Sequence, residues 1–261
     1  MKSVAKQIDS LIAESVYNKR READGFPVSS DTKHMIFAGP SGTGKTDIAE
    51  TIAPLYHALG LIPTDKFVAP SKSDLIGRHL GDTQAMVKEQ FDKARGGVLF
   101  IDEAYDLVNG KDDMYGNQAV VTLLDLMEKH RDDTVVILAG YPEAMAEFLK
   151  TNQGLPSRFS TTINFPPYSD ADLLKIAGVF FHKGDYKMEA GGAKALKQAI
   201  AEFGSGNARN VRNLVQKIVS AHKQRTAFDS EADLTRITAD DVVNGIEAYR
   251  ATRLNVGESK R

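Results

Sequence analysis

The apolar residues of the chain recur with two different spacings. From Val4 to Val16 they lie three and four positions apart, which predicts an amphipathic opening helix. Short apolar runs without polar alternation then alternate with helical stretches, as is typical of a parallel sheet with both faces covered. We therefore expect an α/β fold with a five-stranded parallel sheet and helices on both faces. The expected strands are residues 34–38, 67–68, 98–101, 135–139 and 162–165.

The pattern changes after Pro166 and Pro167, because no further strand run follows and the apolar spacing is helical. Ser169 or Asp170 is positioned to cap the first helix of this part, and Thr238 to cap the last. We expect a small all-helical domain after the α/β domain, and then a flexible tail. The expected boundaries are 1–166 for the α/β domain with its opening helix, 167–252 for the helical domain and 253–261 for the tail.

Composition excludes several classes of protein. The 261 residues are 42% hydrophobic and 26% charged, which is ordinary for a folded chain and unlike a disordered one. No apolar run approaches the roughly 18 residues that span a bilayer, and charges interrupt the apolar positions at the start. We therefore expect a soluble, cytoplasmic protein. The chain has no cysteine, which excludes thiol chemistry, and its net charge of -2 gives no general attraction to nucleic acid.

A glycine-rich loop lies between the expected strand 34–38 and the next helix, and it matches the pattern G-x-x-x-x-G-K-[ST]. In this setting the backbone N–H groups of the loop surround a triphosphate, which requires small residues. Lys45 would neutralise the β- and γ-phosphate oxygens, and the hydroxyl of Thr46 would bind Mg²⁺. We therefore expect ATP and Mg²⁺ as ligands. The loop residues are Gly39, Pro40, Ser41, Gly42, Thr43, Gly44, Lys45 and Thr46.

Two adjacent carboxylates follow the expected strand 98–101. Asp102 and Glu103 would lie at the carboxyl edge of the sheet, beside the glycine-rich loop. Asp102 is expected to hold the Mg²⁺ ion through its water shell. Glu103 is expected to orient and deprotonate the water that attacks the γ-phosphate. Acidic residues often end strands as solvated surface, and it is the glycine-rich loop upstream that favours the catalytic interpretation.

The two motifs and the segment Leu75–Thr83 between them resemble those of the AAA+ ATPases. More narrowly, they resemble the CfxQ-like group that contains the Rubisco activase CbbX, the sporulation protein SpoVK and the ATPase domain of the type VII secretion component EccA. The likeness extends from about residue 4 to about residue 250, and its further matching segments are 97–105, 131–141 and 206–213.

The resemblance implies an ATP hydrolase that assembles into a ring, a hexamer by expectation, with nucleotide bound between neighbouring subunits. Arg158 matches the arginine finger of the family, which stabilises charge on the γ-phosphate of the next subunit. Its other interpretation is a surface arginine at a helix end. Arg209 matches the sensor-2 arginine that contacts the γ-phosphate from the helical domain, with Arg212 as the competing candidate.

The resemblance also implies a central pore that pulls on a protein partner. Arg78, His79 and Leu80 stand at the pore-loop position, where His79 replaces the Tyr or Phe of many relatives. Tyr141 stands where the polar sensor-1 residue is expected, and the residue that takes this role stays open. Adenine contacts are expected from Val4, from Ile8 and from the helical domain, or the base is held loosely.

Three functions compete on these observations. The leading one is a chaperone-like, Mg-ATP-dependent ring ATPase that remodels a protein partner by threading it through the pore loops. The second is an AAA+ ATPase that acts on nucleic acid as a helicase loader or branch-migration motor. It draws on a basic stretch without acidic residues: Arg209, Arg212, Lys217, Lys223 and Arg225. The third is a nucleotide-gated scaffold with little turnover, against which the intact Lys45, Glu103 and Arg158 argue.

Overall fold

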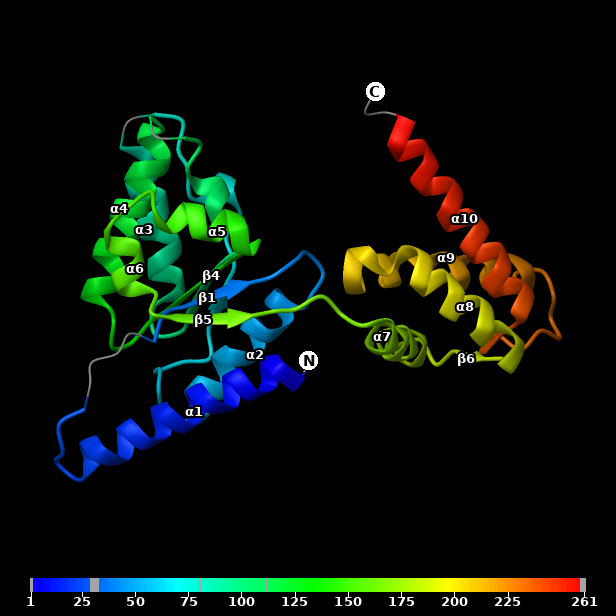
Figure 1. Ribbon diagram of the computed structural model, residues 1–261, viewed down its shortest axis with the longest axis horizontal. Coiled ribbons are helices and arrows are strands. Elements are labelled where there is room, and N and C mark those ends of the chain that lie inside the picture. Colours follow the sequence, from blue (N-terminus) through cyan, green and yellow to red (C-terminus); the bar gives the residue numbers. More distant parts are fainter. Residues whose placement is uncertain (1, 29–32, 80, 111, 259–261) are drawn as a thin grey trace. The chain divides into compact units, whose positions relative to one another are not determined.

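The computed structural model describes residues 2–28, 33–79, 81–110 and 112–258. Contacts within the chain divide it into two compact units (Figure 1). The first unit contains the chain up to Pro40 together with residues 44–166. The second contains Ser41–Thr43 together with the chain from Pro167 onwards. Among the described residues, no helix combines the length and the apolar character that crossing a membrane requires.

The first unit is built on a parallel sheet of five strands, as the sequence predicts. The strand order is β2-β3-β4-β1-β5, and every neighbouring pair is parallel. Because β4 lies between β1 and β3, the carboxyl ends of these three strands meet at one edge of the sheet. The strands are β1 (Met35–Ala38), β2 (Phe67–Val68), β3 (Val98–Ile101), β4 (Val135–Gly140) and β5 (Thr161–Asn164).

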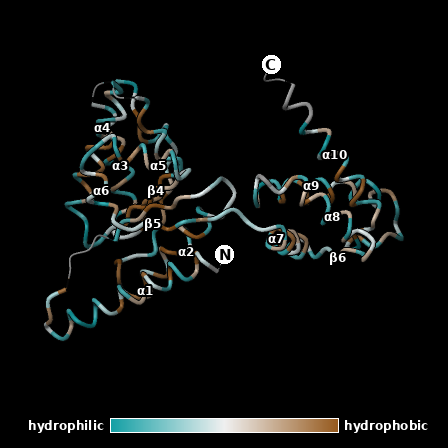
Figure 2. The backbone as a smooth tube through the Cα atoms, in the orientation of Figure 1, coloured by the Kyte–Doolittle hydropathy of each residue, from teal (hydrophilic) through white to brown (hydrophobic). Residues whose placement is uncertain are grey.

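Helices cover both faces of this sheet. Successive strand residues point to opposite sides, and since both sets are apolar, each face needs a covering layer. Ile36 and Leu138 belong to one buried apolar cluster, with α3, α4, α5 and α6, whereas Phe37 and Ile137 belong to the other, with α1 and α2. Figure 2 shows the apolar strands at the centre of the unit. The helices are α1 (Lys2–Ala23), α2 (Lys45–Ala58), α3 (Asp82–Ala94), α4 (Met114–Lys129), α5 (Pro142–Leu149) and α6 (Gly154–Arg158), with 3-10 turns η1 (Lys72–Asp74) and η2 (Ala104–Leu107).

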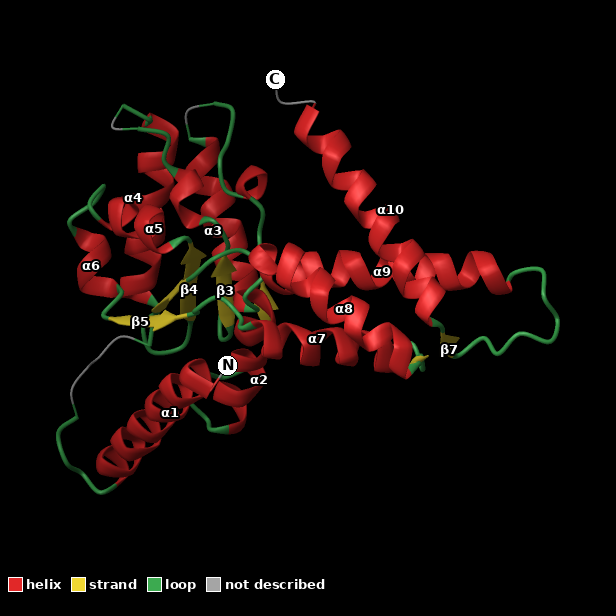
Figure 3. Cartoon of the chain, turned by 45° about the vertical axis from the view of Figure 1, so that its right-hand side comes forward, coloured by secondary structure: helices red, strands yellow, loops and turns green. Residues whose placement is uncertain are grey.

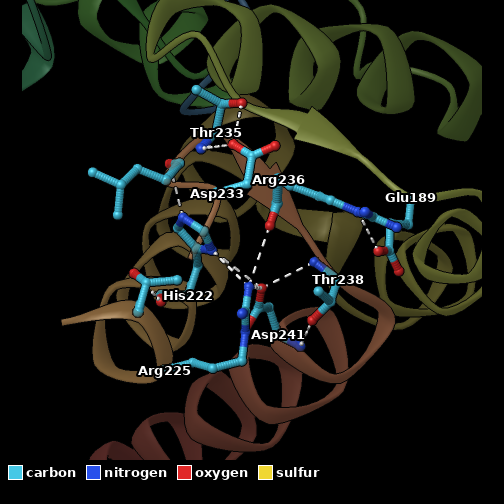
Figure 4. A network of polar contacts seen from close by, with 10 residues as sticks. Glu189, His222, Arg225, Asp233, Thr235, Arg236, Thr238 and Asp241 are labelled. Carbon is cyan, nitrogen blue, oxygen red and sulfur yellow. Dashed lines mark hydrogen bonds and ion pairs between the residues drawn. The ribbon is translucent and has the colours of Figure 1, made fainter. Parts of the chain in front are cut away.

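The second unit packs four helices around its own apolar cluster, which includes Leu173, Ile200 and Ile218 (Figure 3). The described part of this unit also contains one pair of two-residue parallel strands, which the sequence pattern does not predict. A buried polar network joins α9 to the start of α10 (Figure 4). The elements are α7 (Asp170–Lys183), β6 (Lys187–Met188), α8 (Ala190–Phe203), η3 (Gly204–Gly206), α9 (Asn207–Thr226), β7 (Arg236–Ile237) and α10 (Ala239–Glu258).

Local hydrogen bonds set several helix ends that periodicity alone leaves open. The helix α4 begins at Met114, because Oδ1 of Asp113 accepts the N–H of Gly116 at 2.9 Å. Ser169, not Asp170, caps α7 by accepting the N–H of Asp172 at 3.2 Å. The final helix continues to Glu258, beyond the expected domain end at residue 252.

Candidate active site

The glycine-rich loop connects β1 to α2 in a conformation that its glycines permit. Gly42 and Gly44 have φ angles of 74° and 87°, in the left-handed region that side chains disfavour. An added Cβ at Gly39 would collide with the backbone carbonyl of Phe165, so no larger residue fits there. Small residues are therefore needed along this turn, as expected for a loop whose backbone surrounds phosphate groups.

Lys45 is folded into the loop that precedes it. The residue is only 8% exposed, and its Nζ donates to the carbonyl oxygens of Gly39 at 2.8 Å and of Pro40 at 3.0 Å. The same nitrogen lies 6.0 Å from the ring centroid of Tyr141, which follows β4. Lys45 therefore holds its ammonium group at the carboxyl edge of the sheet, where phosphate oxygens would replace the loop carbonyls as acceptors.

The expected acidic pair follows β3 at the same edge. Asp102 and Glu103 are both exposed, and Oδ1 of Asp102 accepts the N–H of Glu103 at 3.0 Å. Glu103 has a φ of 50°, a conformation that residues other than glycine seldom adopt. Such backbone strain is concentrated at functional sites. The turn therefore leaves two solvated carboxylates at the edge of the sheet that also carries Lys45.

Gly140 links the glycine-rich loop to the segment after the acidic pair. Its carbonyl accepts the N–H of Gly39 at 3.0 Å, and an added Cβ would press against the ring of Tyr105. Burial raises the pKa of Tyr105 to about 12, and the carboxylate of Glu103 adds to this increase. Tyr105, in η2 after β3, therefore packs against the end of β4. Sequence reasoning did not single out this residue, which lies in an ordinary apolar-polar run.

The oxygen donors at this edge fit an Mg²⁺ ion that arrives with a nucleotide. Thr46 and Asp102 are exposed, and hydroxyl and carboxylate oxygens are the ligands that this hard cation takes. Within the described residues, no group of three or more His, Cys, Asp or Glu side chains could hold a metal by itself. Mg²⁺ typically binds through one or two carboxylates together with substrate phosphates, and the carboxylate of Asp102 with the hydroxyl of Thr46 fits this pattern.

Arg158 lies at a different edge of the first unit. It ends α6, three residues before β5, and the start of β5 pairs with the start of β1. In a parallel sheet this is the edge opposite to the glycine-rich loop. Its Nη2 contacts Oε2 of Glu128 at 2.8 Å, and its Nη1 donates to Oγ of Ser157 at 2.9 Å. The chain therefore does not bring Arg158 to its own Lys45.

The two arginines proposed for sensor 2 have different surroundings within the second unit. Arg209 is exposed in the first turn of α9, where the preceding residue, Ala208, donates its N–H to the carbonyl of Gly42 at 3.0 Å. An added Cβ at Gly42 would lie 3.0 Å from the backbone nitrogen of Arg209. Arg212 instead stacks its guanidinium 5.4 Å from the ring centroid of Phe180. Arg209 thus lies beside residues 41–43 of the glycine-rich loop, and Arg212 packs on α7.

The expected pore-loop residues lie between η1 and α3. Arg78 and His79 are exposed, and the backbone N–H of His79 donates to Oδ2 of Asp82 at 3.1 Å. The third residue of this prediction, Leu80, lies outside the described residues. Val4, expected near adenine, is buried in the core of the first unit.

A lysine closed into a glycine-rich turn and an acidic pair at the same edge of a parallel sheet define a P-loop nucleoside triphosphatase. The sequence profile of the ATPase family associated with various cellular activities (AAA) matches residues 35–167, and that of the AAA lid domain matches residues 169–251. The chain belongs to the AAA ATPase family, a class of ATP hydrolases. The predicted fold and family are thereby confirmed.

Curated relatives narrow the resemblance. The chain is 37% identical over 253 residues to protein CbxX of Cupriavidus necator. The aligned region covers 93% of this chain and 80% of CbxX. It is also 37% identical over 276 residues to the ESX-1 secretion system protein EccA1 of Mycobacterium tuberculosis, covering 98% of this chain and 48% of EccA1. The chain thus spans about half the length of EccA1. These relatives confirm the predicted likeness to the CbbX and EccA group.

Solved structures agree with the fold. The RuvB Holliday junction branch migration motor of Thermotoga maritima matches with a TM-score of 0.61 over 95% of this chain and 69% of the RuvB chain. The sequence identity is 20%, so this likeness concerns the fold alone.

Proposed function

We propose that the chain hydrolyses Mg-ATP at a site shared by two copies in a ring, hexameric as the family resemblance implies, and that this cycle remodels a protein partner in the cytoplasm. Family membership supports the ATPase reaction. Family membership alone does not give the shared site, the ring or the protein partner. The main support for a shared site is that Arg158 lies at the edge of the sheet away from Lys45 of the same chain.

The hydrolytic step uses groups at the carboxyl edge of the sheet. Glu103 accepts a proton from the attacking water. At the same time the water oxygen forms a bond to the γ-phosphorus, and the bond between the γ-phosphorus and the β-γ bridging oxygen breaks. Lys45 donates to the β- and γ-phosphate oxygens and stabilises the negative charge that remains on them. Mg²⁺ held by Thr46 and by Asp102 supplies further charge neutralisation when bound.

Arg158 completes the site of a neighbouring copy. A guanidinium that cannot reach its own nucleotide is suited to stabilise charge on the γ-phosphate of the next subunit. In a ring, each copy then gives one Arg158 and receives another, which is the head-to-tail interface that ring closure requires. The ATPase rate therefore depends on assembly.

Arg209 is the better candidate for contact with nucleotide from the lid domain. Its helix start is hydrogen-bonded to residue 42 of the glycine-rich loop, whereas Arg212 is engaged with Phe180. A change in the nucleotide bound to that loop would therefore act on the first turn of α9.

A protein partner is favoured over nucleic acid. EccA1, one of the similar proteins, is named as a protein of the ESX-1 secretion system, and this supports a protein partner. The observation for nucleic acid is the basic stretch on α9, but Arg225 forms an ion pair with Asp241 and Arg212 stacks on Phe180. Two of its five cations are therefore engaged within the second unit. The exposed Arg78 and His79 are the residues that we propose to contact the partner protein.

Subunit complementation tests the shared site. Glu103→Gln should bind ATP but turn it over at least about 100-fold more slowly, and Arg158→Ala should also keep only a small residual rate in a pure ring. When the two variants are mixed and reassembled, some sites receive Glu103 from one copy and Arg158 from its neighbour. Phosphate release should then return to about a quarter of the wild-type rate on random mixing.

The control for this experiment is Arg95→Ala, which removes another arginine of the first unit that forms an ion pair, here with Asp133. It should keep wild-type activity alone and give no complementation effect. Two outcomes contradict the proposal: mixed variants that stay inactive although mass spectrometry detects mixed rings, and Arg158→Ala rings that hydrolyse ATP at the wild-type rate.

A further inference from the structure

The arginine assigned to the neighbouring site is held within its own chain by an acidic residue on another helix. Glu128 lies in the last turn of α4, and its Oε2 contacts Nη2 of Arg158 at 2.8 Å. The other terminal nitrogen of the guanidinium, Nη1, donates to Oγ of Ser157 at 2.9 Å, and that hydroxyl donates to the carbonyl of Gly154 at 2.9 Å. Both terminal nitrogens of Arg158 are therefore engaged within the first unit.

Glu128 has a second cation within reach. Its Oε1 lies 3.7 Å from Nη1 of Arg131, just beyond the end of α4. If Arg158 turned away, this carboxylate would keep a positive neighbour, and about half of its side chain is exposed to water. Departure of Arg158 would therefore not leave a buried, uncompensated charge, which is what makes breaking an ion pair costly.

Phosphate and Glu128 compete for the same nitrogens. An arginine binds a phosphate group best through two parallel N–H donors, and a carboxylate that stayed in place would occupy Nη2 and repel the phosphate. We propose that Glu128 is a positioning residue for Arg158: it holds the guanidinium in a resting orientation, and this contact opens when Arg158 reaches the nucleotide of the adjacent subunit. This inference rests on the proposed shared site.

The expected effect is small and has a defined sign. Exposed or half-exposed ion pairs contribute little, so removing this one raises the population of free Arg158 by about two- to five-fold. Glu128→Gln keeps the size of the side chain and removes its charge, and it should therefore raise kcat for ATP about two- to five-fold with KM unchanged. Glu128→Asp, which is one methylene shorter, should give an increase in the same direction.

Asp125→Asn is the matched control. Asp125 lies one turn earlier on α4, is similarly exposed and pairs with Lys129 at 2.6 Å instead of with Arg158. This variant should leave kcat and KM as they are in the wild type. Thermal unfolding and native mass spectrometry of the three variants verify that folding and assembly are unchanged.

The second control repeats Glu128→Gln in the Arg158→Ala background. There the substitution should have no effect on the residual rate, since the residue that Glu128 restrains is absent. The inference is overturned if Glu128→Gln leaves kcat unchanged or lowers it, if Asp125→Asn produces the same increase, or if the increase persists without Arg158. Failure of the shared site is recognised separately, because Arg158→Ala alone would then retain wild-type turnover.

Discussion

His34 illustrates how burial fixes the charge state of a single side chain. It is 1% exposed directly before β1, and its Nδ1 accepts the backbone N–H of Val136 at 3.0 Å. This bond requires an unprotonated Nδ1, and therefore a neutral ring. Burial lowers the pKa of His34 to about 4; the carbonyl of Met127 opposes this shift, and the positive charges of Lys33 and Arg158 reinforce it.

The depressed pKa of His34 predicts a loss of stability in mild acid. The unfolded chain takes up a proton near pH 6.5, whereas the folded protein does so only near its pKa of about 4. Stability is therefore fully present above pH 6.5 and falls by up to about 3 kcal/mol as the pH decreases toward 4. Urea unfolding of the whole chain at several pH values measures this slope.

His34→Asn should be less stable than the wild type at pH 7.5 but should lose less stability between pH 6.5 and 4. The asparagine oxygen can replace Nδ1 as an acceptor, and it does not titrate. His182→Asn is the matched control, because this histidine is exposed on α7, and it should keep the wild-type slope. An unchanged slope in His34→Asn would show that His34 is not the group responsible.

Residues that carry local motifs could be predicted from the sequence, whereas their long-range partners could not. Lys45, Thr46, Asp102 and Glu103 follow strands at short, fixed spacing, and the sheet brings both motifs to one edge. The contact of Arg158 with Glu128 joins residues on different helices, and no pattern along the chain encodes it. Sequence resemblance to the AAA+ ATPases could suggest a role for Arg158 but not what holds it.

At the scale of elements, the junction of α9 with α10 depends on one buried carboxylate. Asp241 is 1% exposed in the first turn of α10, and its two oxygens contact Nε and Nη2 of Arg225 at 2.8 and 2.9 Å (Figure 4). Asp241 and Thr238 also form a reciprocal cap, since the carboxylate accepts the N–H of Thr238 and the hydroxyl accepts that of Asp241. Burial alone would raise the pKa of Asp241, but hydrogen bonds from Arg225 and from Thr238 outweigh it and lower the pKa to about 2.

Asp241→Asn should destabilise the second unit by about 2–4 kcal/mol, because it removes the charge that Arg225 needs and one acceptor of the helix cap. The wild-type contribution is present above pH 3.8 and is lost as the pH falls toward 2. Circular dichroism during thermal unfolding measures the change.

Asp240→Asn removes an exposed charge from the same helix turn and should cost only a few tenths of a kcal/mol. Equal effects of the two substitutions would argue against the network.

At the scale of the whole molecule, hydrophobic patterning could predict the five strands and the change to helices after Pro167, but not the strand order. The strands β1, β3 and β4 are short and buried on both faces, so the sequence of each is compatible with several positions in the sheet. The observed order brings β4 between the glycine-rich loop and the acidic pair. This arrangement explains why residues after β4, such as Tyr141, lie beside Lys45 without belonging to either motif.

The charge distribution of the whole molecule predicts which polymer stimulates ATP hydrolysis. The net charge of -2 gives no long-range attraction to DNA, and at physiological salt the field of the remaining basic residues on α9 is screened beyond about 8 Å. We expect an unfolded test protein such as reduced, carboxymethylated lactalbumin to raise steady-state phosphate release at least about two-fold. The reason is that the binding energy of the test protein would help to assemble the ring and to position the catalytic groups. Single- and double-stranded DNA should leave the rate unchanged.

His79→Ala should lower the ratio of stimulated to basal rate, whereas Lys217→Gln, on α9, should not. Stimulation by DNA that disappears in Lys217→Gln would instead assign this ATPase to nucleic acid.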